Sequence, residues 1–271
     1  MRVHQGGERT GTFIVTGEHR RFSEFADAVR KHRYIGVCHG PAGVGKTLSA
    51  RRYARWDVAQ TLLNEWGPRE ESDAKVYAAL ARSRSVFYTP TVGATLGELR
   101  KDLPRLLSRV DICVDQHVSP PGCSPSHRRP SHVELIIVDE AERLSTTALE
   151  YLRDMFDREG VGLILIGMPG IQMRPQLYSR VGFAHAYRPL QDEELTFVLT
   201  RRWRQLGLNL DDADFTDTKA IATIVRITGG NFRLVHRLFV QIERILRINE
   251  LNAITDDVVE AARSVLVIGA T

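Results

Sequence analysis

The feature that most constrains the fold of this chain is a glycine-rich run at residues 40–47, which reads Gly-Pro-Ala-Gly-Val-Gly-Lys-Thr. It matches the pattern G-x-x-x-x-G-K-[ST], in which glycines allow successive backbone N–H groups to surround phosphate oxygens. The run follows an apolar segment at 34–38 and precedes a predicted helix at 47–59. A helix that begins here directs the positive end of its dipole at the phosphates. The sequence therefore predicts a phosphate-binding loop between a buried strand and a helix.

This loop also supplies the side chains that a bound nucleoside triphosphate requires. Lys46 is expected to reach the β- and γ-phosphates, and the Thr47 hydroxyl is expected to bind Mg²⁺. The full predicted binding set is Gly40, Pro41, Ala42, Gly43, Val44, Gly45, Lys46, Thr47 and Leu48.

A second acidic motif ends another apolar run, Ile136-Ile137-Val138-Asp139-Glu140. Two carboxylates at a strand end are weak evidence alone, but phosphoryl transfer beside a phosphate-binding loop needs groups of this kind. We expect Asp139 to bind Mg²⁺, directly or through water. We expect Glu140 to polarise the attacking water as a general base.

The rest of the chain predicts an α/β fold with a parallel sheet and a C-terminal helical lid. Continuous apolar runs alternate with amphipathic segments, which is typical of a parallel sheet covered on both faces. The pattern changes to helices after Leu190, so we predict an α/β nucleotide-binding domain at 1–190 and a helical lid domain at 191–271. The stretch 119–132 has four prolines and predicts a flexible loop. The predicted strands are 34–38, 86–88, 133–138 and 161–166; the predicted helices are 18–32, 47–59, 95–109, 145–158, 192–205, 218–228, 231–249 and 255–266.

With these motifs in place, the chain resembles an AAA+ ATPase, with Walker A at 40–47, Walker B at 135–140 and a helical lid. Within that superfamily it is most similar to transposition regulators of the TnsC, TniB and Mu B type, and ExeA/GspA-type ATPases are related. The resemblance implies ATP and Mg²⁺ as cofactors and a homo-oligomer, a filament or ring on double-stranded DNA that activates a transposase. The segments that carry it are Gly40–Thr47, Leu135–Glu140, Leu163–Pro169, Leu177–Arg180 and Thr228–Arg233.

The same resemblance assigns two arginines to the nucleotide. Arg180 resembles the arginine finger that reaches the nucleotide of the neighbouring subunit, with Arg174 and Arg188 as nearby alternatives. Arg233 resembles the lid arginine called sensor 2, which contacts the γ-phosphate, with Arg237 as its alternative. Both would act on charge that builds up on the γ-phosphate.

The chain departs from this family at the end of the fourth core strand. The sensor 1 position there usually carries a polar side chain, but Gly167-Met168 offers no strong hydrogen-bond donor. We therefore expect slow ATP hydrolysis that assembly or a partner stimulates. An alternative is a scaffold that binds ATP as a switch and does not turn it over usefully.

The charge of the chain does not by itself identify its partner. The chain has 37 basic and 33 acidic residues, and only five of the basic ones are lysine. Arginine excess fits a polyanion partner, but it also fits a genome rich in arginine codons. The candidate DNA contacts are Arg100, Lys101, Arg105, Arg128 and Arg129, although the last two also suit a solvated loop tip.

Several other classes of protein are disfavoured. No apolar run approaches the ~20 residues of a membrane helix, and the first residues lack the apolar region of a secretory signal. Three cysteines do not make a disulfide framework, so we expect a cytoplasmic protein.

A helicase loader or replication initiator is one alternative to the transposition function. A secretion-associated ATPase is another, but it would be expected to carry a membrane segment and a further C-terminal domain.

Overall fold

The computed structural model describes residues 13–68, 70–119, 131–168, 179–211 and 213–266. The chain divides into two compact units. One unit is Arg21–Arg188, and the other joins the residues up to Arg20 to Pro189–Thr271. Among the described residues, no helix combines the length and the apolar character needed to cross a bilayer.

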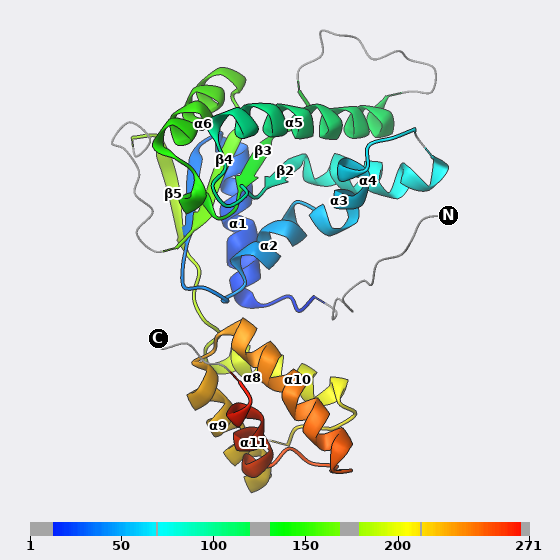
Figure 1. Ribbon diagram of the computed structural model, residues 1–271, viewed down its shortest axis with the longest axis vertical. Helices are drawn as coiled ribbons and strands as arrows, with labels where there is room; N and C mark the ends of the chain where they lie inside the picture. The colour runs from blue at the N-terminus through cyan, green and yellow to red at the C-terminus, as the bar shows by residue number, and fades with distance from the viewer. Residues whose placement is uncertain (1–12, 69, 120–130, 169–178, 212, 267–271) are drawn as a thin grey trace. The chain divides into compact units, whose positions relative to one another are not determined.

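A five-stranded parallel sheet forms the centre of the first unit (Figure 1). The three strands β2, β3 and β4 are buried at every position, which requires cover on both faces. The edge strand β5 instead alternates between half-buried and exposed residues. The order is β2-β3-β4-β1-β5, with bounds β1 Ile35–His39, β2 Ser85–Tyr88, β3 Leu135–Val138, β4 Gly162–Gly167 and β5 Val181–Ala186.

Helices surround this sheet and share one core with it. Phe22 and Val29 of α1, Leu103 of α5 and Leu152 of α6 are fully buried in that core. The helices of the unit are α1 Gly17–His32, α2 Lys46–Tyr53, α3 Trp56–Asn64, α4 Ala74–Ser83, α5 Leu96–Val118 and α6 Thr146–Glu159, with short 3₁₀ turns at Glu71–Asp73 and Ala141–Arg143.

The predicted α/β parallel-sheet fold is confirmed, with differences in four elements. The helix predicted at 47–59 is two helices, because Arg55 adopts a left-handed conformation with φ 56° between them. The helix predicted at 95–109 continues to Val118, and its Pro104 lies inside it. Two elements were not predicted. Helix α4 lies between 59 and 95, where no helix was expected, and the residues of β5 do not form the continuous apolar run that marks the other strands.

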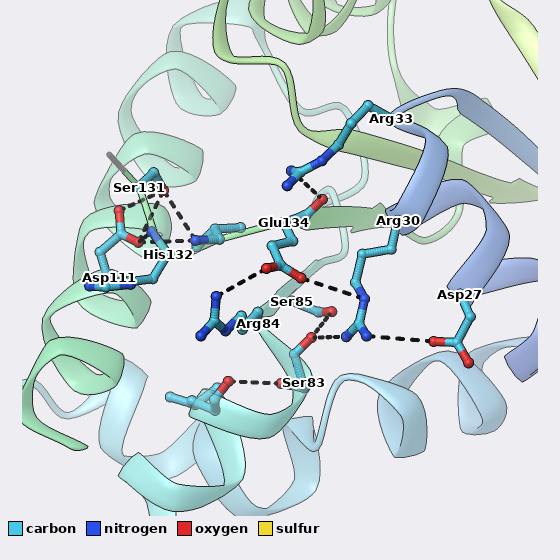
Figure 2. Close-up of polar contacts among 12 residues, drawn as sticks. Asp27, Arg30, Arg33, Ser83, Arg84, Ser85, Asp111, Ser131, His132 and Glu134 are labelled. Carbon is cyan, nitrogen blue, oxygen red and sulfur yellow. Dashed lines mark hydrogen bonds and ion pairs between the residues drawn. The ribbon is translucent and has the colours of Figure 1, made fainter. Parts of the chain in front are cut away.

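A polar network holds the amino-terminal edge of this sheet together (Figure 2). The Glu134 carboxylate, just before β3, contacts Arg84 at 3.0 Å and Arg30 at 3.6 Å, so it joins α1 to the turn before β2. The Asp111 carboxylate on α5 accepts hydrogen bonds from the backbone of His132 at 2.7 Å and from the Ser131 hydroxyl. Because β3 is fixed at this end, the residues that follow its other end are held in register with the neighbouring strands.

The second unit is helical. Its core surrounds Trp203, whose ring lies 5.3 Å from that of Phe239, and includes Ile14 from the N-terminal segment. Gly230 has φ 72°, and a Cβ there would lie 1.9 Å from the carbonyl oxygen of Leu190, so glycine is required. The helices are α8 Asp192–Gln205, α9 Phe215–Thr228, α10 Phe232–Ile248 and α11 Asp256–Ser264.

Candidate nucleotide-binding site

The glycine-rich loop joins β1 to α2 at the carboxyl-terminal edge of the sheet. Gly45 has φ 115°, a left-handed conformation that residues with a side chain rarely adopt. At Gly40, a Cβ would lie 2.3 Å from the carbonyl oxygen of Tyr187. The loop therefore depends on glycine at both positions, as a backbone cradle for phosphate does.

Lys46 folds back over this loop. Its Nζ donates hydrogen bonds to the carbonyl oxygens of Gly40 at 2.5 Å and Pro41 at 2.7 Å. Lys46 is also the first residue of α2, so its ammonium lies near the positive end of a helix dipole. Two sources of positive potential thus converge on the loop, which suits a polyphosphate.

Asp139 follows β3 and meets Thr47 from the loop. The Thr47 hydroxyl acts on the Asp139 carboxylate and lowers its pKa, and Asp139 Oδ1 accepts the backbone N–H of Glu140 at 3.0 Å. Only 3% of Asp139 is exposed. Burial raises the pKa of Asp139 above its ordinary value, because removal from water disfavours the charged form. The two sequence motifs therefore meet in space.

These two side chains fit a magnesium site. A hydroxyl and a carboxylate are the hard oxygen donors that Mg²⁺ prefers, and Mg²⁺ commonly takes one or two protein ligands together with substrate phosphates. Within the described part of the chain, no cluster of three or more His, Cys, Asp or Glu side chains could hold a metal by itself. The donor set is that of a metal shared with a bound nucleotide.

Glu140 is held by an arginine that the sequence analysis did not identify. Glu140 has φ 50°, and its carboxylate contacts the guanidinium of Arg143 in the 3₁₀ turn that follows. Arg143 also donates to the carbonyl oxygen of Pro90, after β2, at 3.0 Å. A basic residue three positions after the acidic pair was the available signal.

A second contact that was not predicted from the sequence is made to the loop by Tyr187. The Tyr187 hydroxyl lies 2.7 Å from the Ser49 hydroxyl on α2, and both side chains are buried. The Tyr187 backbone N–H donates to the carbonyl oxygen of His39, at the end of β1. Tyr187 follows β5, so the edge strand that the sequence analysis missed helps to place the loop.

Arg180 lies at the opposite edge of the sheet from the loop of its own chain. Its carbonyl oxygen accepts the N–H of Ile35 at the start of β1, whereas the loop follows the end of that strand. The separation is roughly 15–20 Å at ~3.3 Å per strand residue. Arg180 Nε donates to Asp157 on α6 at 2.8 Å. Its own loop is out of reach, and the alternative Arg174 lies outside the described residues.

The sensor 1 position lies beside the loop, because Gly167 pairs with His39, the residue that precedes it. At the sensor 1 position, Gly167 ends β4 and Met168 is 42% exposed. Arg233 is the second residue of α10 in the helical unit, where the Asn231 side chain accepts its backbone N–H at 3.1 Å. Its contact with a γ-phosphate therefore stays a prediction.

The candidate DNA contacts divide into three groups. Arg100 lies over the ring of Tyr151 at 5.4 Å, and Arg105 contacts Asp102 at 3.4 Å. Lys101 is exposed beside them on α5. Arg128 and Arg129 lie outside the described residues.

A parallel sheet with a glycine-rich loop after β1 and an acidic pair after β3 defines a P-loop nucleoside triphosphatase. The chain belongs to the AAA domain family, whose model matches residues 29–174. It is 44% identical over 266 residues to a potential ATP-binding protein of Staphylococcus aureus, an alignment that covers 95% of this chain and 97% of the relative. The predicted AAA+ fold and nucleotide binding agree with these similarities.

More distant similarities are to one DNA transposition protein and to solved structures that share the fold. It is 23% identical over 238 residues to the Mu-like prophage FluMu DNA transposition protein B of Haemophilus influenzae, covering 84% of this chain and 71% of the relative. The RuvB Holliday junction branch migration motor of Thermotoga maritima has the same fold, with TM-score 0.55, 17% identity, and 92% and 68% coverage. So does the Aeropyrum pernix ORC2 protein, with TM-score 0.51, 17% identity, and 92% and 67% coverage.

Proposed function

We propose that this protein is an ATP-dependent, sequence-nonspecific DNA-binding ATPase that assembles on duplex DNA and activates a transposase at its target. The contact between Thr47 and Asp139 carries the ATPase part of the proposal, because it joins the phosphate loop to the acidic strand end. The DNA part is supported by the similarity to a DNA transposition protein over 84% of the chain.

The chemistry assigned to the site is positioning and charge neutralisation. Lys46 would leave the carbonyl oxygens of Gly40 and Pro41 and bind the β- and γ-phosphates. Thr47 and Asp139 would hold Mg²⁺, which neutralises charge on the phosphates. Glu140 would orient the attacking water and accept its proton once its carboxylate is released from Arg143.

Arg180 makes this an assembly-dependent enzyme in our proposal. Since Arg180 lies at the far edge of the sheet from its own loop, it would stabilise the transition state on the nucleotide of an adjacent subunit. The ion pair with Asp157 would have to open for that contact to form. This requirement, together with the apolar sensor 1 position, accounts for the slow turnover that we expect from the isolated chain.

Nucleotide state would then control assembly by linkage. A triphosphate that contacts two subunits binds the assembled form more tightly than the separate chains, so it shifts the equilibrium toward assembly. Hydrolysis at Glu140 would remove the γ-phosphate and favour disassembly.

Electron microscopy of negatively stained samples tests this proposal. The protein is mixed with duplex DNA and ATP, ADP or no nucleotide over a series of salt concentrations. We expect filaments or rings on DNA with ATP only. Glu140→Gln should keep ATP binding and stabilise the assemblies, whereas Lys46→Ala should lose both. ATP-dependent assemblies that ignore DNA would favour a protein-remodelling role, and normal assembly of Lys46→Ala on DNA would contradict the proposal.

A further inference from the structure

The outer face of α10 in the helical unit carries a row of arginines. Arg233, Arg237, Arg244 and Arg247 are all exposed, and with Val240 they follow the spacing i, i+4, i+7, i+11, i+14. This spacing places them along one stripe of the helix. The row spans about 21 Å at 1.5 Å per residue. The opposite face packs into the core through Val235, Leu238, Phe239, Ile242 and Leu246.

These four guanidinium groups differ from other cations of the same unit. Lys219 on α9 contacts Asp256 at 3.1 Å, and Arg226 and Arg263 both contact Glu260. Within the described residues, the side chains of the α10 row have neither an ion pair nor a hydrogen bond. The single acidic residue of α10 is Glu243. The row is therefore an uncompensated positive surface.

The charge of α10 differs from that of α5, the helix that carries three of the DNA contacts expected from the sequence. Helix α5 carries four basic residues, but its four acidic residues balance them. Arg105 contacts Asp102, and Arg100 covers Tyr151. Attraction for a polyanion depends on the net field of a surface, and α10 has an excess of three positive charges where α5 has none.

We propose that Arg237, Arg244 and Arg247 of this row bind the sugar–phosphate backbone of duplex DNA, which leaves Arg233 for the nucleotide. Arginine forks match phosphate oxygens bidentately, and the row contains no lysine. The exposed face of α10 presents no Phe, Tyr or Trp ring, whereas single-strand binding relies on rings that stack with bases. Its exposed aliphatic side chains are Val240 within the row and Ile248 at its end, which are too few for the apolar centre of a protein interface. This inference rests on the DNA-binding part of the proposed function.

The test is the affinity for a fluorescently labelled duplex, measured by anisotropy with a non-hydrolysable ATP analogue across a salt series. The variant is Arg244→Gln/Arg247→Gln, which spares the predicted nucleotide contact Arg233. The matched control is Lys31→Gln/Lys75→Gln, two exposed lysines of α1 and α4 outside the candidate DNA contacts, which loses the same charge. For the α10 variant, the slope of log affinity against log salt should become shallower by about 1.8, since each phosphate contact contributes ~0.9. Its affinity should fall at least about tenfold, and the control should keep the wild-type slope. Thermal unfolding at the wild-type temperature would verify that the variant is folded.

Four other outcomes would refute the proposal that α10 binds DNA. Wild-type affinity in the α10 variant would refute this surface and leave the proposed function standing. An equal loss in both variants would show a net-charge effect and also refute it. Loss of binding to poly-glutamate, with duplex binding retained, would assign the row to an acidic protein. If the wild-type protein binds no duplex in any nucleotide state, the proposed function fails and this surface fails with it.

Discussion

The Thr47 hydroxyl lowers the pKa of the Asp139 carboxylate, although the two residues follow strands of the sheet, β1 and β3, that are not neighbours. Thr47 is placed by the loop after β1, and Asp139 follows β3, with β4 between them. The contact depends on the parallel register, because Val138 and Leu165 are paired and His39 and Gly167 are paired. The sheet thus sets the distance between the two groups expected to share a metal ion.

Asp139→Asn separates the structural cost of this carboxylate from its binding role. Burial raises the pKa of Asp139, so its ionised form opposes folding at neutral pH. The amide has nearly the same shape and can keep the contact with Thr47 without the charge. We expect the variant without nucleotide to unfold at a temperature a few degrees higher, on the order of 1 kcal/mol of stability.

The same variant should no longer gain stability from Mg²⁺ added with ATP, because one predicted ligand is lost. Differential scanning fluorimetry with and without Mg²⁺ measures both effects. A lower unfolding temperature in the absence of nucleotide would show that the charge of Asp139 stabilises the fold, contrary to this account.

Arg143→Ala tests whether the contact with Glu140 restrains catalysis. The substitution frees the Glu140 carboxylate to orient water. We expect the steady-state ATPase rate of the isolated chain to rise several-fold, within the ~10²–10⁴ that a general base contributes. Glu140→Gln in the same assay sets the floor. A rate as low as that of Glu140→Gln would instead make Arg143 a necessary part of the site.

If Arg180 acts on the nucleotide of an adjacent subunit, two inactive variants should restore ATPase activity when they are mixed. Lys46→Ala has a defective loop and an intact Arg180, and Arg180→Ala has the reverse. If the site is shared between chains, a mixture of the two should recover part of the wild-type ATPase rate at concentrations that permit assembly. Asp157→Asn should raise the rate of the otherwise unaltered chain, because it releases Arg180. A mixture no more active than its components would place the role of Arg180 within one chain or outside catalysis.

The helical unit should lose stability in acid. The Thr223 hydroxyl and the Lys219 ammonium lower the pKa of Asp256, and Arg226 lowers the pKa of Glu260. A folded-state pKa below the unfolded value adds stability above the ordinary pKa, and that stability is lost as the pH falls through the folded value. We therefore expect weaker denaturant resistance as the pH falls below about 5.

Trp203 reports on this unit, since it is 1% exposed in the helical core. In a Trp56→Phe/Trp66→Phe background its fluorescence follows the unit alone. Asp256→Asn should be less stable than this background at pH 7, and the difference should vanish in acid. A difference that grew on acidification would reverse the sign and contradict the argument.

The motif residues and the alternating strands were sufficient to predict the nucleotide loop and the parallel sheet. Residues 40–47 and 135–140 constrain backbone conformation and chemistry locally, so both motifs were visible in the sequence. The edge strand β5 was not, because it lacks full burial and hence a continuous apolar run.

The contacts that regulate the site escaped prediction for another reason. Glu140 and Arg143 are three residues apart, a spacing too common to single out the pair, and Arg180 and Asp157 are far apart in the sequence. The row on α10 could have been found from its spacing in the sequence. Its lack of ion-pair partners required the positions of the surrounding acidic side chains.

The central claim is that the loop at Gly40–Thr47 binds Mg²⁺–ATP, and equilibrium binding of a fluorescent ATP analogue tests it most directly. We expect saturable binding by the wild-type protein that strengthens with Mg²⁺. Lys46→Ala should bind at least about 100-fold more weakly, the loss of nearly 3 kcal/mol expected when a charge-assisted contact to phosphate is removed. Binding by Lys46→Ala with wild-type affinity would contradict the account.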